Sequence, residues 1–254
     1  MQLIQTNGTV LSSLEMGAQG FTPVLMIHGL MFGNMATWYS SMAAPMAKQH
    51  HVVLYDQRGH GDSPVTATGY DLDTQLADLR SVLAHYGLDR RPIDVVGHSM
   101  GAVLALNMAL TTQDRVRRLV LVDAPLPVGE HVLPDLLNVH SPEVLAGYID
   151  ANQNASGGRR RERMHRRLEQ LFFHSTLVRD LTDYPTPSDS ELSRLRVSTL
   201  LVYGRHSHCV ASGAKLESLL PAARLELLDC GHYVVEDQPD ALRQLVISFL
   251  EDRE

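Results

Sequence analysis

The sequence predicts an α/β fold, a mostly parallel β-sheet with helices on both faces. Short apolar runs, typical of buried strands, alternate with longer stretches in which apolar residues recur at helical spacing. A sheet built this way is mostly parallel, because each helix carries the chain back to the start of the next strand. The strands expected in this alternation span residues 23–27, 51–55, 93–96, 119–122, 199–203 and 224–228.

Local signals add the elements around those strands. Residues 2–14 contain two short strand patterns around Asn7-Gly8, a dipeptide typical of hairpin turns. Helices are expected around residues 38–46, over 72–83, where leucines recur at helical spacing, and from Pro239, a favoured first helical position.

One turn has a pattern that carries chemistry. Gly97-His98-Ser99-Met100-Gly101 follows the strand at 93–96 and opens into the apolar segment 102–110. A serine on such a strand-to-helix turn has its hydroxyl lifted clear of the backbone, and the following helix N-terminus favours negative charge beside it. A Cβ at Gly97 or Gly101 would collide with the neighbouring strand or helix at so sharp a turn. The pattern predicts a nucleophilic serine at position 99.

Composition limits the classes of protein to consider. The 254 residues suit one α/β domain with room for an insertion, and no run approaches the roughly 18 apolar residues of a membrane span. The net charge of −7 argues against nucleic acid as a general partner. Residues 1–9 do not resemble a secretory signal, and Cys209 and Cys230 are expected to be free thiols. We therefore expect a cytoplasmic, reduced protein.

The alternation of strands and helices stops between Asp123 and Val197. This stretch contains helical patterns and several prolines, but no convincing strand. In parallel sheets the functional groups gather at the carboxyl ends of the strands, and an insertion at this point would lie over that edge. The expected organisation is a core formed by residues 1–124 and 197–254, with a helical cap over residues 125–196.

Four motifs in order resemble the α/β-hydrolase family. They are His28-Gly29 after a strand, the D-x-R-G-x-G-x-S pattern over residues 56–63, the turn at Ser99, and Gly231-His232 before the last helix. The resemblance covers nearly the whole chain apart from the cap. It implies the α/β-hydrolase fold, with the helical cap inserted after strand six.

The resemblance also implies roles for particular residues. Ser99 would be the nucleophile, and His232 the general base that accepts its proton and returns it to the leaving group. The backbone N–H groups of Leu30 and Met100 would form the oxyanion hole. The resemblance implies no cofactor.

The acid of the triad departs from the usual pattern. Most of the family places an Asp at the end of a G-x-x-D turn after the seventh strand, but here the turn 204–207 ends in Ser207. A branch of small bacterial esterases is similar in having serine there and taking its acid after the sixth strand, where this chain has Asp123. We predict Asp123 as the acid. Two alternatives stay open: Asp123 as a partner for the first turn of the cap, or Asp229, three residues before His232, as the acid.

The thirteen histidines do not predict a metal site. His206 and His208 lie two apart in one loop, and no H-x-x-x-H or Cys/His cluster gives ligand spacing on a helix. His98 is expected to pack at the turn beside the nucleophile, and His28 to hold the oxyanion loop by hydrogen bonds.

Arginines crowd one segment of the cap: Arg159, Arg160, Arg161, Arg163, Arg166 and Arg167. Between and after them, apolar residues recur at helical spacing: Met164, Leu168, Leu171 and Phe172. One helix face therefore packs down, and the arginines face away. They either form a solvated basic face or contact an anion, such as a phosphate of coenzyme A or phosphopantetheine, or an acidic carrier protein.

Together these features predict a serine hydrolase, a carboxylesterase or thioesterase acting on small to medium acyl groups through an acyl-enzyme. The expected partner is an acyl ester or thioester, with coenzyme A or acyl carrier protein as possible carriers. An acyl pocket could be lined by Met31, Phe32, Leu133, Leu136 and Leu137, which core packing explains equally well. The alternatives are a carbon–carbon bond hydrolase or lyase on the same triad, and a non-catalytic ligand-binding protein.

Overall fold

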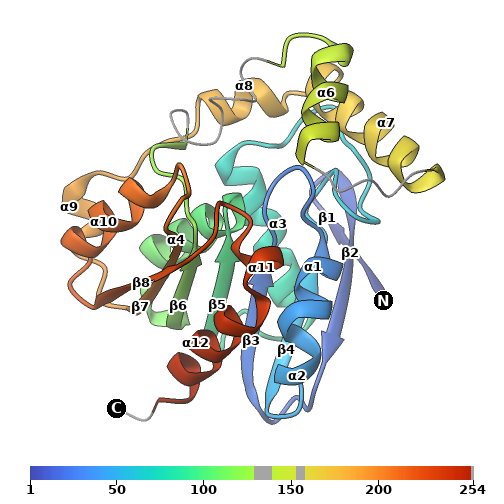
Figure 1. Cartoon of the computed structure of the whole chain (residues 1–254). Coiled ribbons are helices and arrows are strands. Elements are labelled where there is room, and N and C mark those ends of the chain that lie inside the picture. Colours follow the sequence, from blue (N-terminus) through green and yellow to red (C-terminus); the bar gives the residue numbers. More distant parts are fainter. Residues whose placement is uncertain (129–138, 153–157, 253–254) are drawn as a thin grey trace.

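A single sheet forms the centre of the computed structural model, which describes the chain except for residues 129–138, 153–157 and 253–254 and the side chains of residues 152 and 160 (Figure 1). The strands are β1 (Gln2–Thr6), β2 (Thr9–Met16), β3 (Thr22–Ile27), β4 (His50–Tyr55), β5 (Ile93–His98), β6 (Val116–Val122), β7 (Ser198–Gly204) and β8 (Ala223–Leu228). They form one eight-stranded sheet in the order β1-β2-β4-β3-β5-β6-β7-β8. All neighbours from β4 to β8 are parallel, and only the β1-β2 and β2-β4 pairs are antiparallel. The predicted mostly parallel sheet is confirmed.

Helices cover both faces of the sheet (Figure 1). One face carries α1 (Met35–Trp38), the π-helical turn η1 (Tyr39–Ala43), α2 (Ala44–Met46), α11 (Val234–Asp237) and α12 (Pro239–Glu251). The other face carries α3 (Leu72–His85), α4 (Met100–Thr111) and α10 (Val210–Leu219), and a short 3₁₀ turn, η2 (Gln113–Arg115), precedes β6. This arrangement confirms the expected layers of an α/β fold.

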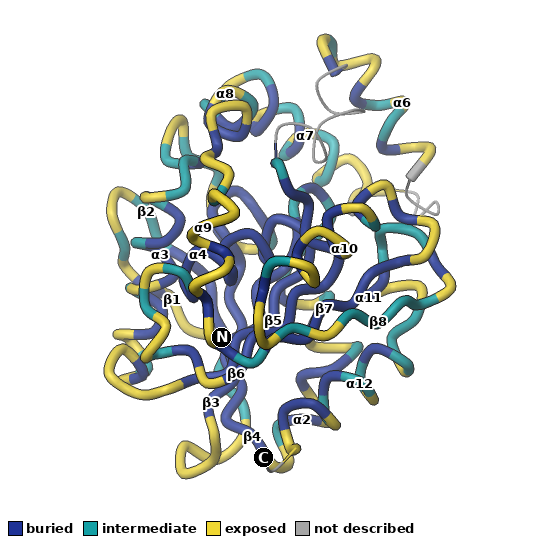
Figure 2. The backbone as a smooth tube through the Cα atoms, turned by 90° about the vertical axis from the view of Figure 1, so that its left-hand side faces the viewer, coloured by how far each residue is buried: buried dark blue, intermediate teal, exposed yellow. Residues whose placement is uncertain are grey.

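The central strands are buried on both faces, as Figure 2 shows. In β3, Val24 and Met26 join one apolar cluster, whereas Leu25 and Ile27 join the other. Successive side chains of a strand point to opposite faces, so one continuous apolar run supplies both layers of core. This double burial explains why these strands could be recognised from short apolar runs.

Two expected elements differ in detail. The helix around residues 38–46 is broken into α1, η1 and α2, although Trp38, Met42 and Met46 all pack toward the sheet. We attribute the break to Pro45, which has no N–H to continue the α-helical hydrogen bonds. Strand β6 begins at Val116, earlier than expected, and its second residue, Arg117, is exposed and forms an ion pair with the buried Asp94.

The cap helices follow β6 and precede β7: α6 (Pro142–Asn152), α7 (Arg159–Phe173), α8 (Leu177–Thr182) and α9 (Asp189–Leu192). Helices α6, α7 and α8 lie above the carboxyl edge of the sheet, whereas α9 lies beside α10 (Figure 1). On α7, Leu168, Leu171 and Phe172 are buried. A helical insertion after strand six is therefore confirmed, while its exact limits, 125 and 196, stay a prediction. No helix within the described residues is both long enough and apolar enough to cross a membrane.

Candidate active site

Ser99 occupies a sharp turn between β5 and α4. Its backbone has φ 53° and ψ −123°, a left-handed conformation that is costly for a residue with a side chain. A Cβ at Gly97 would lie 2.3 Å from the carbonyl oxygen of Gly101, and one at Gly101 would lie 2.3 Å from that of Ile27. The turn therefore requires glycine at both positions, and it places Ser99 at the carboxyl edge of the sheet.

Three side chains from distant parts of the chain form a continuous hydrogen-bonded series at this edge. The Ser99 Oγ–H donates to Nε2 of His232 at 3.0 Å, and Nδ1–H of His232 donates to Oδ2 of Asp123 at 2.6 Å. Ser99 follows β5, Asp123 follows β6, and His232 lies between β8 and α11. The order of donors gives His232 the neutral tautomer with its free lone pair toward the serine.

Asp123 is completely buried, and its carboxylate is held from several sides. Besides the bond from His232, Oδ1 accepts from the backbone N–H of Gly204 at 2.8 Å, and Oδ2 accepts from the Ser207 hydroxyl at 2.5 Å. The backbone N–H of Cys209 in turn donates to Oγ of Ser207 at 3.0 Å. The carboxylate is therefore directed at the imidazole rather than at the first turn of the cap.

Ser207 has a contact that the sequence did not reveal. From the sequence, Ser207 stands only where most of the family has the triad carboxylate. In the structure its hydroxyl donates to the carboxylate of Asp123, which follows β6. The rival acid, Asp229, instead accepts from Nε2 of His206 at 2.8 Å, in an exposed pair. In the sequence, the contact between Ser207 and Asp123 was indicated only by their positions, because each follows a strand that ends at the same edge of the sheet.

The loop after β3 brings backbone donors toward Ser99. A Cβ on Gly29 would lie 3.1 Å from Cβ of Ser99, so the loop backbone passes directly against Ser99. Met100 is the first residue of α4, and the first N–H groups of a helix have no acceptor within it. In the described part of the chain, the N–H groups of Leu30 and Met100 donate to no other protein group. Both are available to an oxyanion.

His28 holds this loop in place. Its Nδ1–H donates to the carbonyl of Gly29 at 2.7 Å, and its Nε2 accepts from the backbone N–H of Gln57 at 3.0 Å. Burial lowers the pKa of His28 to about 4, so the ring is neutral at physiological pH. His28 therefore holds the loop after β3 by hydrogen bonds, as expected.

His98 supports the base. It is buried at the turn beside Ser99, and its Nε2–H donates to the backbone carbonyl of His232 at 3.0 Å. Burial, and then the proximity of His232, lowers the pKa of His98 to about 4. His98 therefore packs at the turn, as expected, and also holds the backbone of His232.

The neutral state of His98 predicts a pH dependence of stability. Its pKa is near 6.5 in the unfolded chain and about 4 in the native protein, so only the unfolded chain binds this proton between those values. The free energy of unfolding should therefore fall as the pH falls through this window, by about 2 kcal/mol between pH 7 and pH 5 for this histidine.

The measurement compares urea unfolding of the wild type and His98→Asn at both pH values. Glu236, whose pKa burial raises to about 6, acts in the opposite direction and is common to both proteins. The wild type should therefore lose about 2 kcal/mol more than the variant on acidification. Equal losses in the two proteins would contradict the assignment of His98 as a buried neutral ring.

One cluster beside the triad has potential metal ligands. Donor atoms of His208, Cys209 and His232 lie within 4.8 Å of one another. However, Nδ1 of His232 is already bonded to Asp123, and burial raises the pKa of the Cys209 thiol, which disfavours the thiolate that a metal would need. The chemistry of this cluster does not fit a resident metal. Cys209 and Cys230 are both free thiols.

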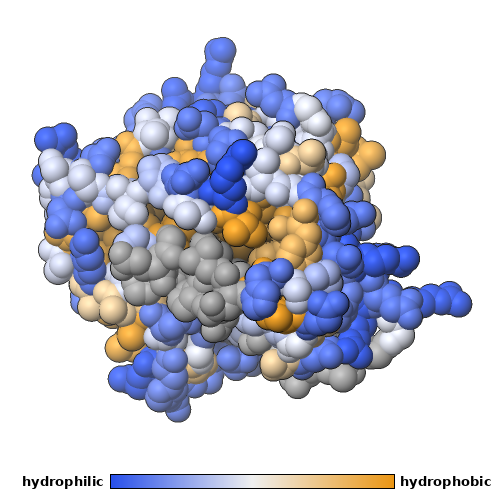
Figure 3. Space-filling view, turned by 90° about the horizontal axis from the view of Figure 1, so that it is seen from above, coloured by the Kyte–Doolittle hydropathy of each residue, from blue (hydrophilic) through white to orange (hydrophobic). Residues whose placement is uncertain are grey.

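The proposed acyl-pocket residues are only partly described. Leu133, Leu136 and Leu137 lie outside the described residues, whereas Met31 and Phe32 border a cavity of about 430 Å³ beneath α7. The ring of Phe32 lies 6.4 Å from that of Tyr148 in α6 and 6.3 Å from that of Tyr233. Seen from above, hydrophobic side chains reach the surface near the centre of this face and are bordered by hydrophilic ones (Figure 3).

Several known proteins are similar to this chain in sequence. It is 26% identical to the dihydrolipoyllysine-residue acetyltransferase component of the acetoin cleaving system from Pseudomonas putida, over 98% of this chain and 69% of that protein. It is 29% identical to the sn-1-specific diacylglycerol lipase ABHD11 of Mus musculus, over 89% of this chain and 80% of that protein. A putative carbamate hydrolase, RutD of Enterobacter cloacae, is 34% identical, but over only 43% of this chain and 40% of that protein.

Solved structures and a family profile extend the comparison. A membrane phospholipase A described as a bacterial virulence factor superposes with a TM-score of 0.82 at 25% identity, over 98% of this chain and 85% of that one. An esterase from Exiguobacterium antarcticum superposes with a TM-score of 0.78 at 22% identity, over 98% of this chain and 99% of that one. The family described as alpha/beta hydrolase fold matches residues 22–183, more than half of the sequence. The chain belongs to the α/β-hydrolase family.

Proposed function

We propose that the protein is a serine hydrolase that cleaves carboxylic esters or thioesters of small to medium acyl groups. The observation that carries this proposal is the hydrogen-bonded series from Ser99 through His232 to the buried Asp123. An arrangement of this kind activates a hydroxyl for attack on an acyl carbon. The named relatives that span most of the chain, a lipase and an acetyltransferase component, support acyl chemistry.

The geometry supports a two-step reaction. Ser99 Oγ attacks the acyl carbon while its proton passes to Nε2 of His232, and the negative charge on the carbonyl oxygen is stabilised by the N–H groups of Leu30 and Met100. The imidazolium then donates its proton to the departing oxygen or sulfur, leaving an acyl-enzyme. Water, deprotonated by His232, releases the acid and restores Ser99. Asp123 holds the ring in the required tautomer and stabilises its charged form.

The first test is covalent labelling of the nucleophile. A fluorophosphonate should add once to the wild-type protein, detected as a single mass increase in the intact chain, because only an activated serine attacks it at a useful rate. Ser99→Ala should show no adduct. A folded wild-type protein that is not labelled would overturn the proposal in favour of a non-catalytic ligand-binding protein.

Substrate profiling then separates the enzymatic alternatives. Turnover of p-nitrophenyl esters that disappears in Ser99→Ala supports the hydrolase of esters or thioesters. A labelled enzyme that turns over neither esters nor thioesters would instead favour the carbon–carbon bond hydrolase or lyase on the same triad.

A further inference from the structure

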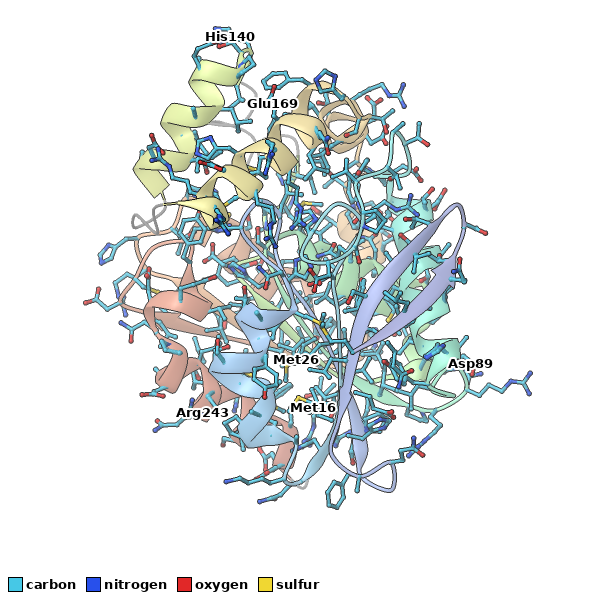
Figure 4. The ribbon with its side chains drawn as sticks, turned by 90° about the vertical axis from the view of Figure 1, so that its right-hand side faces the viewer. Met16, Met26, Asp89, His140, Glu169 and Arg243 are labelled. Carbon is cyan, nitrogen blue, oxygen red and sulfur yellow. The ribbon has the colours of Figure 1, made fainter. Side chains whose placement is uncertain are left out.

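A groove beside the active site combines cationic and apolar walls. It is the cavity of about 430 Å³ that lies between α7 on one side and the loop after β3 with α1 on the other. Figure 4 shows these elements one above the other, with α7 above α1. Arg161, Arg163 and Arg167 line it from α7, and Met31 and Phe32 line it from the loop. We call this cavity the α7 groove.

Two of the three arginines are not paired with carboxylates. Arg161 forms an ion pair with Asp150 of α6. Among the described residues, Arg163 and Arg167 form no ion pair, although the protein as a whole has a net charge of −7. Unpaired guanidinium groups that face a common groove attract an anion, and phosphate matches the fork of their donors.

The carboxylates on the groove wall do not cancel this charge. Asp56 and Asp62 both line the groove. Both oxygens of Asp56 are hydrogen-bonded to the backbone: they accept from the N–H groups of Met35 at 2.7 Å and Asp62 at 2.8 Å. These bonds orient the Asp56 carboxylate away from a ligand but do not neutralise it. Three guanidinium groups and two carboxylates line the groove, so cationic groups outnumber anionic ones there.

A buried histidine on the same wall has an unused acceptor. His60 lines the groove and is only 3% exposed. Its Nδ1–H donates to the carbonyl of Arg58 at 3.0 Å, and burial lowers its pKa to about 3, so the ring is neutral. Within the described residues its Nε2 has no hydrogen-bond partner. This nitrogen is enclosed by the protein, so a ligand in the groove can contact the neutral ring of His60 but cannot donate to Nε2.

The loop after β3 connects the groove with the candidate active site. Met31 and Phe32, which line the groove, directly follow Leu30, one of the two proposed oxyanion donors. The ring of Phe32 lies 6.3 Å from that of Tyr233, the neighbour of His232 in the chain. A leaving group that departs from the acyl carbon can therefore extend along Phe32 toward Arg163 and Arg167.

We propose that the α7 groove binds the phosphate-bearing part of a thioester leaving group of the coenzyme A type, with its phosphates on Arg163 and Arg167. The inference rests on the proposed function and specifies its substrate. In the reaction, the C–S bond breaks, the thiolate leaves along the groove with the proton from His232, and water supplies the hydroxyl of the released acid.

The kinetic test reverses the groove charges and compares two substrates that share one acyl group. Arg163→Glu/Arg167→Glu should raise KM for butyryl-coenzyme A about tenfold or more, while kcat/KM for p-nitrophenyl butyrate stays unchanged. The matched control is Arg166→Glu. It reverses one arginine on the same helix, but Arg166 borders a neighbouring cavity with Glu162 and His165 and does not line the α7 groove. The control should behave as wild type with both substrates. Equal losses on the two substrates, or an equal effect of Arg166→Glu, would overturn the proposal.

A binding test separates this inference from the catalytic proposal. Calorimetry of coenzyme A with Ser99→Ala, which cannot turn over substrate, should show binding that weakens with salt and is lost in the charge-reversed background. Pantetheine, which lacks the phosphates, should bind more weakly. Ester turnover without coenzyme A binding would overturn the groove assignment and leave the serine hydrolase standing. Co-sedimentation with phosphatidylglycerol vesicles that depends on Arg163 and Arg167, without coenzyme A binding, would likewise overturn it in favour of a lipid surface.

Discussion

Asp123→Asn should lower kcat for ester hydrolysis by about 10⁴-fold while leaving the protein folded. An asparagine amide can donate to Nδ1 of His232, which would place the ring proton on Nε2, facing Ser99. The imidazole could then no longer accept the serine proton. The measurement is kcat with p-nitrophenyl acetate, and far-UV circular dichroism confirms that the fold is retained.

Two further variants make this expectation specific to position 123. Asp229→Asn is the matched control, because Asp229 is paired with His206 in solvent, and it should retain wild-type activity. Adding Ser207→Asp to Asp123→Asn should recover at least about tenfold of the lost rate, because it returns a carboxylate to the turn that carries it in most of the family. Full activity in Asp123→Asn, or its loss in Asp229→Asn, would refute Asp123 as the acid.

Arg58→Met should reduce the free energy of unfolding by about 3–5 kcal/mol, because it leaves the buried carboxylate of Asp78 without its partner. Nε of Arg58 lies 2.8 Å from that carboxylate, and both side chains are about 5% exposed or less. The same guanidinium also donates to the carbonyls of Asn7 and Thr68. One side chain thus joins the β1-β2 hairpin, the loop before α3 and α3 itself. Urea denaturation measures the loss.

The exposed pair of Arg90 with Asp89 provides the control for this effect. The side chain of Arg90 is 90% exposed and that of Asp89 is 48% exposed. Arg90→Met should therefore change the free energy of unfolding by less than about 0.5 kcal/mol. A similar small change in Arg58→Met would show that the D-x-R-G pattern does not stabilise the fold through a buried ion pair.

The sequence predicted the strands of the parallel sheet because burial on both faces leaves a continuous apolar run. It failed where the determinant lies elsewhere in the chain. The start of β6 was missed because two arginines, Arg117 and Arg118, interrupt the apolar run. Arg117 is exposed and pairs with Asp94 on β5, whereas Arg118 is buried. We attribute the break at η1 to Pro45, but the sequence alone did not show that the chain would continue as a π-helical turn rather than end the helix.

The candidate site was predictable where chemistry depends on a local pattern. Ser99 and His232 lie in short motifs that specify a turn. Asp123 was only one of the candidates for the triad acid, because nothing in the neighbouring sequence distinguishes a catalytic carboxylate from one that bonds the first turn of the cap. The hydroxyl of Ser207 and the carbonyl of His232 contact residues 84 and 134 positions away, respectively. Such partners become apparent only when the strand order brings their ends together. The same holds for the α7 groove, which joins the cap to the loop after β3.

The bonds around Asp123 have a consequence for how this protein can diversify. Its N–H donates to the carbonyl of Val202, its carboxylate accepts from Gly204, and the next residue, Ala124, accepts from the Tyr203 hydroxyl at 2.9 Å. Residues 123 and 124, which precede the expected cap, are thus hydrogen-bonded to β7. We therefore expect changes in the length or sequence of the cap to leave the position of Asp123 undisturbed, so that the proposed triad can be combined with caps that select other substrates.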